Sequence, residues 1–146
     1  MAVSKLTELE KYLKIANECG DYIVMGIAFV KNDDLNNELT QSIVNQGLSI
    51  LQKRHPFFRA YLNEDANIQV QNKDYDPIDL DWSDNSIPHS ELITQLEVFN
   101  SKLFDFKYKS NFVRCKVASF ISLTGDKMYS VNLALALIIT GNKRLN

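Results

Sequence analysis

The chain has 146 residues and a mass of 16.7 kDa, which fits one domain with a hydrophobic core of its own. Hydrophobic residues make up 45% and charged residues 23%, which excludes a disordered chain, and three Pro and five Gly exclude a collagen-like or linker-like polymer. The formal net charge of -2 provides no field that would attract nucleic acid or anionic lipid. We therefore expect a globular protein that binds neither nucleic acid nor a membrane.

The two cysteines, Cys19 and Cys115, are far apart and too few for a disulfide framework, and they have no metal-ligand spacing to the two histidines. The N-terminus lacks a basic segment followed by an apolar run, and no stretch approaches the ~18 consecutive apolar residues of a membrane span. These features predict a cytoplasmic protein in a reducing setting, without a metal ion or a cofactor.

The first third of the chain predicts a helix, a strand and a second helix. Residues 4–18 have a helical apolar stripe that Ser4 or Thr7 can cap, and residues 22–30 are apolar on both faces, as in a central strand. Apolar residues then recur every three or four positions from Leu35 to Lys53, and Asp33 or Asp34 can cap this second helix. The first stripe consists of Leu6, Leu9, Leu13 and Ala16.

The rest of the chain predicts two hairpins around a third helix. Residues 57–62 and 68–71 form the first hairpin, and residues 72–86 form an acidic, irregular surface segment. A helix with Pro88 in its first turn follows, and residues 112–123 and 128–139 form the second hairpin, with a Gly-containing turn. The buried stripe of that helix consists of Leu92, Leu96, Phe99 and Leu103.

This order of elements predicts an α/β chain of the α+β sandwich type, with a mixed β-sheet covered on one face by two long helices. We expect a single domain over residues 1–146, with flexible tails at about 1–4 and 141–146. The strand at 128–139 is apolar for longer than an exposed edge tolerates, which predicts pairing with another chain and hence a homo-oligomer or a partner protein.

Three segments in the proper order carry a family resemblance. A Leu-spaced helix runs into Arg54, His55, Pro56 and, three residues later, Arg59, while residues 6–10 precede it and residues 103–106 follow it. The last of these segments contains Phe104 and Asp105. Together they resemble the N-terminal half of the superfamily of condensation domains, alcohol acetyltransferases and chloramphenicol acetyltransferase, which implies one half of that fold.

In that family the corresponding strand ends in His-His-x-x-x-Asp-Gly, whose second His is the general base for acyl transfer. The matching run here starts at Leu135, and with Gly141 aligned to the motif Gly, Ala136 replaces the base and Thr140 replaces the Asp. With the register shifted by one residue, Leu137 replaces the base. Neither alignment supplies a group that titrates near neutral pH.

Other polar residues have simpler structural interpretations. His55 ends a helix before Pro56, His89 lies in an exposed first turn, and Arg54 and Arg59 support the signature segment more readily than they hold an anion. The acidic run at 74–85 lacks the Gly and Glu of a calcium loop, which favours a solvated loop.

The sequence therefore predicts a catalytically deficient, half-length relative of condensation-type acyltransferases that acts as a non-enzymatic binding or interaction module. Two alternatives stay open. The chain can be the N-terminal half of an active acyltransferase completed by another segment, or a carrier of a small hydrophobic or acyl ligand.

Overall fold

The structure is a computed structural model that describes residues 3–18, 23–31, 38–65, 67–102, 104 and 111–136. Its main feature is a four-stranded sheet in the order β2 (Ile23–Lys31), β7 (Lys127–Ala136), β6 (Val113–Ile121), β5 (Asp79–Pro88). Strand β7 is antiparallel to both β2 and β6, whereas β5 runs parallel to β6. The sheet is mixed, which confirms the predicted fold class.

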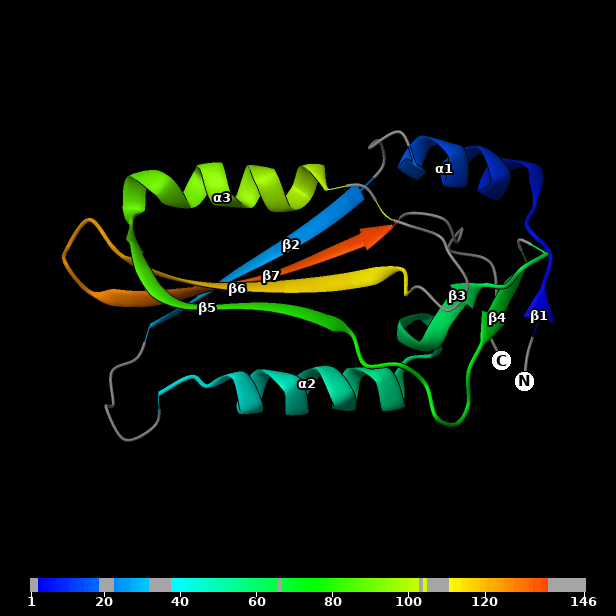
Figure 1. The fold of residues 1–146 in the computed structure, drawn as a ribbon, viewed down its shortest axis with the longest axis horizontal. Coiled ribbons are helices and arrows are strands. Elements are labelled where there is room, and N and C mark those ends of the chain that lie inside the picture. Colours follow the sequence, from blue (N-terminus) through cyan, green and yellow to red (C-terminus); the bar gives the residue numbers. More distant parts are fainter. Residues whose placement is uncertain are drawn as a thin grey trace.

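Two long helices cover this sheet, but they lie on opposite faces (Figure 1). Helix α2 (Gln41–Arg54) packs through Leu48 on the face of β6 that carries Val113 and Val117. Helix α3 (His89–Ser101) packs through Leu92 on the other face, next to Ala118. The prediction that both helices cover one face was wrong, and the chain forms three layers.

A smaller three-stranded sheet adjoins the main one, in the order β1 (Val3–Ser4), β4 (Ile68–Val70), β3 (Ala60–Leu62). Helix α1 (Glu8–Glu18) follows β1 in the chain, and Thr7 is the one of the two predicted caps that begins it. Thr7 Oγ1 accepts from the Glu10 amide, and the Glu10 carboxylate accepts from the Thr7 amide. Leu9 of the predicted apolar stripe is exposed, and Glu10 is buried instead.

Several boundaries differ from the predicted ones. Helix α2 begins at Gln41 after the N-cap Thr40, whose hydroxyl accepts from the Ile43 amide, and residues 32–37 lie outside the described part. Pro56–Arg59 forms the 3-10 helix η2 rather than the start of a strand. Residues 72–86, expected to be irregular, contain most of β5. Residues 3 and 4 of the predicted tail form β1, and the other tail residues lie outside the description.

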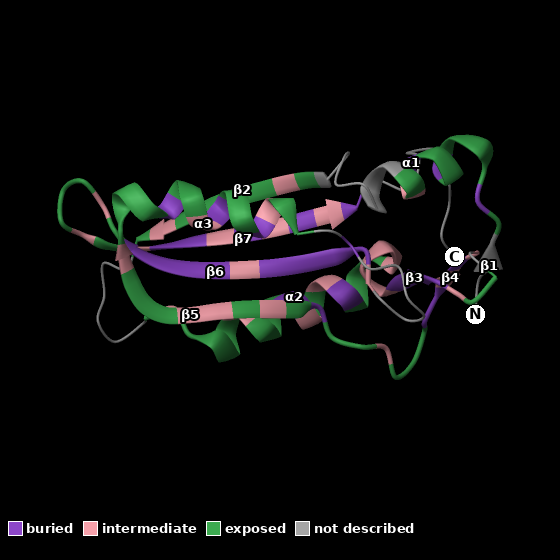
Figure 2. Cartoon of the chain, turned by 45° about the horizontal axis from the view of Figure 1, so that its top comes forward, coloured by how far each residue is buried: buried purple, intermediate pink, exposed green. Residues whose placement is uncertain are grey.

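The strand at Ile23–Lys31 is at an edge of the sheet, whereas the sequence predicts a central strand there. The sequence predicts that the apolar strand at 128–139 pairs with another chain. In the structure this strand, β7, already pairs with β2 and β6 on its two sides. Figure 2 shows the consequence: β6 is buried along nearly its whole length, while β2 and β5 are exposed or half-buried. No helix in the described part of the chain is long and apolar enough to span a membrane.

Candidate functional site

The end of β7 is where the family resemblance places catalysis. Ala136 is the last residue of the strand; its amide donates to the Phe112 carbonyl (2.9 Å), and its side chain is 1% exposed. It packs in an apolar cluster with Phe99, Phe104 and Phe112. Leu135 is half-buried on the opposite, α2 face of the sheet. At this position the described strand offers a methyl group and no proton acceptor.

The other residues of the motif region, Leu137, Thr140 and Gly141, lie outside the described residues. The same is true of Asp105 in the downstream signature, whereas Phe104 is described and buried. The alignment that puts Ala136 at the base position can therefore be placed in the structure, and the alignment that uses Leu137 cannot.

The signature segment after α2 ends that helix and ties it to β4. His55 is the C-cap; its backbone is extended, as a residue before Pro56 requires, and its amide donates to the Leu51 carbonyl (2.9 Å). The Arg59 guanidinium donates through Nη1 to the carbonyls of Gln52 and Lys53 at the end of α2, and through Nε to a carbonyl just after β4. These contacts give Arg59 a structural position.

The remaining signature and histidine side chains lie away from these contacts. Arg54 and His55 are exposed at the end of α2, with the His55 ring edge-on to Phe58 (6.0 Å between centroids). His89 is exposed at the start of α3, with its ring centroid 6.1 Å from that of Phe120. The described residues contain no group of three or more His, Cys, Asp or Glu side chains that could hold a metal ion.

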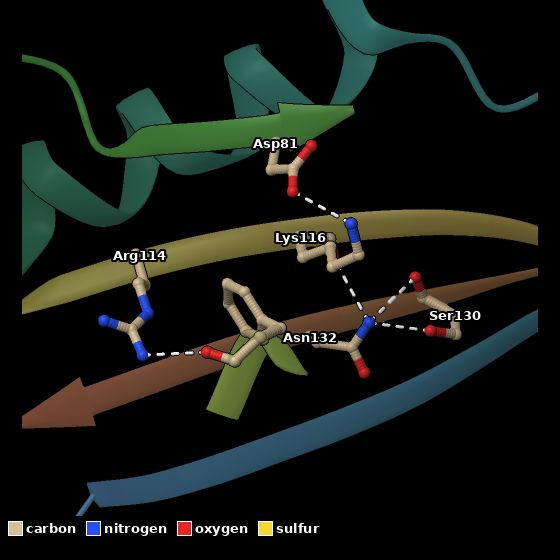
Figure 3. Close-up of polar contacts among 6 residues, drawn as sticks. Asp81, Arg114, Lys116, Ser130 and Asn132 are labelled. Carbon is tan, nitrogen blue, oxygen red and sulfur yellow. Dashed lines mark hydrogen bonds and ion pairs between the residues drawn. The ribbon is translucent and has the colours of Figure 1, made fainter. Parts of the chain in front are cut away.

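A polar cluster lies on the α3 face of the sheet (Figure 3). Asn132 of β7 is fully buried, and its Nδ2 donates to the Lys116 carbonyl (3.0 Å) and to Ser130 Oγ (2.7 Å). The Lys116 ammonium forms an ion pair with Asp81 (2.8 Å) across β5 and β6. The Asn132 Oδ1 atom is buried without a hydrogen-bond partner among the described atoms.

Arg114 is the buried charge of this cluster. Its Nη2 donates to the carbonyls of Phe99 and Lys102 at the end of α3, and its guanidinium lies over the rings of Phe99 (5.2 Å) and Phe104 (4.3 Å). Burial lowers the pKa of Arg114, and the negative charge of Asp79 opposes this shift. The guanidinium therefore anchors the last turn of α3 to the sheet.

An open groove of about 750 Å³ runs between α3 and the β5 side of the sheet. Its floor has two cross-strand pairs of opposite charge, because the parallel register places Asp79 beside Arg114 and Asp81 beside Lys116. The α3 wall includes Gln95. The volume falls within the range of small-molecule sites, and the charged floor suits a polar ligand.

Sequence reasoning missed this groove because it treated the acidic run as a solvated loop. The signal was present: residues 79–82 alternate between acidic and apolar, which is the period of a strand, and the basic residues Arg114 and Lys116 have the same spacing of two. Only the parallel register of β5 against β6 shows that the two patterns face each other.

Comparisons with known proteins support the fold. No family model matches the sequence, and no curated protein matches it. The starter condensation domain of rhizomide synthetase is similar in structure, with a TM-score of 0.65 and 7% identity over 96% of this chain and 34% of that chain. The X-domain from teicoplanin biosynthesis gives a TM-score of 0.64 and 16% identity over 92% of this chain and 28% of that one.

A four-domain nonribosomal peptide synthetase, solved with AMP and glycine bound, gives a TM-score of 0.62 and 14% identity, over 94% of this chain and 10% of that chain. The chain thus spans about a third or less of the length of each of these three proteins. The fold observed here is that of one half of a condensation domain, as the order of the sequence motifs predicts.

Proposed function

We propose that the chain is a non-enzymatic binding or interaction module on a condensation-type scaffold. The observation that carries the proposal is the methyl side chain of Ala136, 1% exposed, at the position where the resemblance expects the general base. A base must lie within hydrogen-bond reach of the acceptor's proton and titrate near the working pH. Neither condition is met by a methyl group among phenylalanine rings.

The two histidines of the chain offer no replacement at that position. His55 ends α2 and His89 begins α3, so neither belongs to β7, and both are exposed. Arg59 and Arg114 donate to backbone carbonyls at helix ends, which are contacts that hold the scaffold together.

The experiment is an acyl-transfer assay on the purified chain with acetyl-CoA or a longer acyl-CoA and an alcohol or amine acceptor. We expect no product above the protein-free blank, with an active condensation-type acyltransferase as positive control. His55→Ala and His89→Ala variants serve as matched controls and leave this baseline unchanged. Robust turnover that disappears in His55→Ala would contradict the proposal.

The groove beside α3 supports the binding part of the proposal. Its floor of paired charges, Asp79 with Arg114 and Asp81 with Lys116, favours a small polar molecule over a hydrophobic or acyl ligand. Native mass spectrometry of the chain purified without added ligand tests the carrier alternative. A complex of the chain with a co-purified hydrophobic compound would favour the carrier.

The alternative of an active acyltransferase completed by another segment needs a histidine from outside this chain. The sequence of the whole gene tests it directly. An open reading frame about three times as long, with His-His-x-x-x-Asp-Gly downstream, would favour the completed enzyme over the binding module.

A further inference from the structure

Strand β2 leaves one long edge of the main sheet without a described partner. Among the described residues it pairs only with β7, over all nine positions from Ile23 to Lys31 and without a shift in register. It contains no charged residue before Lys31 and no proline. Soluble proteins usually protect such edges with charges, proline or bulges, because unpaired N–H and C=O groups attract another strand.

The opposite edge of the same sheet has all of these protections. Strand β5 carries Asp79 and Asp81, ends at Pro88, and has an irregular register with β6 between Ser83 and Ile87. Within the part of the chain that the structure describes, one edge of the sheet is therefore protected against pairing and the other is not.

Exposed apolar side chains lie along the unprotected edge. Val24, Ile27 and Phe29 of β2 are 47%, 44% and 58% exposed. The flank of α3 that lines the groove faces β5, so helical geometry leaves Ile93, which is 59% exposed, on the side of β2.

We propose that the chain forms a two-fold homodimer in which β2 pairs antiparallel with β2 of a second copy, centred on Ile27. In this register Val24 lies opposite Val30 and Met25 lies opposite Phe29, so apolar side chains meet on both faces. Lys31 lies opposite Ile23 at either end, and no two like charges face each other. In β2 the N–H and C=O groups of every second residue point away from β7. Because odd-numbered residues pair with odd-numbered ones in this register, these free-edge groups of the two copies face each other and can form hydrogen bonds.

The arrangement of the two edges favours a second copy over an unrelated strand. Pairing through β2 joins the two sheets into one, and both of its outer edges are then the protected strand β5. The association closes after one step, as a two-fold interface requires. A specific interface buries about 1,200–2,000 Å² in total, and the exposed side chains of β2, together with Ile93 of α3, supply apolar area to it.

Light scattering of the full chain across micromolar concentrations tests the dimer. We expect a mass of twice 16.7 kDa for the unmodified chain and 16.7 kDa for Ile27→Lys, which places two ammonium groups opposite each other at the axis. The matched control Leu123→Lys puts the same charge on an 86% exposed residue in the β6–β7 turn and stays dimeric. Circular dichroism of both variants establishes that they fold.

A disulfide tests the register. Ile27→Cys in a Cys19→Ser background should cross-link two copies under mild oxidation, whereas Val24→Cys, opposite Val30, should cross-link at least about tenfold more slowly. Cys115 is 1% exposed, so we expect it not to form a disulfide under these conditions. A constant mass of 16.7 kDa, a dimer that survives Ile27→Lys, or equal cross-linking of both variants would overturn the proposal. These readouts do not involve acyl transfer, so their failure leaves the proposed function untouched.

Discussion

Replacing Arg59 by Met should destabilise the fold, because this guanidinium holds three carbonyls from two distant segments. The Nε atom donates to the Gln71 carbonyl (3.0 Å), and Nη1 donates to the carbonyls of Gln52 and Lys53 at the end of α2. The guanidinium also lies 5.7 Å from the centroid of the Tyr75 ring. Methionine keeps most of the apolar stem and removes every donor.

The expected loss follows from these contacts. Each bond contributes about 1 kcal/mol net, and the bond to the Lys53 carbonyl is exposed and counts for less. A cation at a helix C-terminus adds about 0.3–1 kcal/mol. Arg59→Met should therefore lower the free energy of unfolding by about 2–3 kcal/mol, which corresponds to a decrease in Tm of about 4–12 °C for a domain of this size.

Urea unfolding followed by circular dichroism measures this loss, with Arg54→Met as the matched control. Arg54 is the last residue of α2 and is exposed, so its replacement should remove only the contribution of a cation at the helix end, about 0.3–1 kcal/mol. Equal losses in the two variants would refute the role given to Arg59. Arg59→Lys separates charge from geometry: a full return to the original stability would show that a charge near the helix end is enough, without the guanidinium fork.

Three further outcomes are expected. Burial raises the pKa of Cys115 to about 11, so in a Cys19→Ser background iodoacetamide at pH 8 should leave the native thiol unmodified and label it only in denaturant, as mass spectrometry will show. The hydrogen bond from Lys127 lowers the pKa of Glu38 from its ordinary value of 4.5. The ionised Glu38 carboxylate therefore stabilises the fold above about pH 4.5, and this contribution is lost as the pH falls through the pKa of the folded state. Glu38→Gln should accordingly make the free energy of unfolding less dependent on pH in the acid range. Ala136→His should overpack its apolar cluster, lowering the free energy of unfolding by about 1–3 kcal/mol in urea unfolding, and an unchanged stability would contradict the close packing of this cluster.

Local signals in the sequence predicted local structure well. The hairpin of β6 and β7 follows from the Gly-containing turn, since Gly125 adopts φ 85°, a left-handed conformation that few other residues tolerate. Helix α3 begins directly after Pro88, and Leu92, Leu96 and Phe99 are buried as its periodicity predicts. The order of motifs was also sufficient to predict one half of a condensation-type fold.

The position of each strand within the sheet was not predictable in the same way. A strand that is apolar on both faces has one pattern whether it lies inside a sheet or at an edge that another chain can cover, so the edge position of β2 has no local signature. Strand β5 was missed because aspartates disfavour strands. Here Asp81 is compensated by Lys116, a residue 35 positions away, and only the fold brings the two together.

The two faces of β7 explain why the base position is apolar while polar residues lie close by in the same strand. Val131 and Leu133 face α2, whereas Ser130, Asn132 and Ala136 share the α3 face. The amide nitrogen of Asn132 is satisfied within the layer, because it donates to Ser130 and to the backbone of β6. Toward the end of β7, Ala136 packs instead in the apolar cluster that contains the phenylalanine rings. The described polar chemistry therefore lies at mid-strand and in the groove over β5 and β6, so a ligand should be sought there rather than at the end of β7.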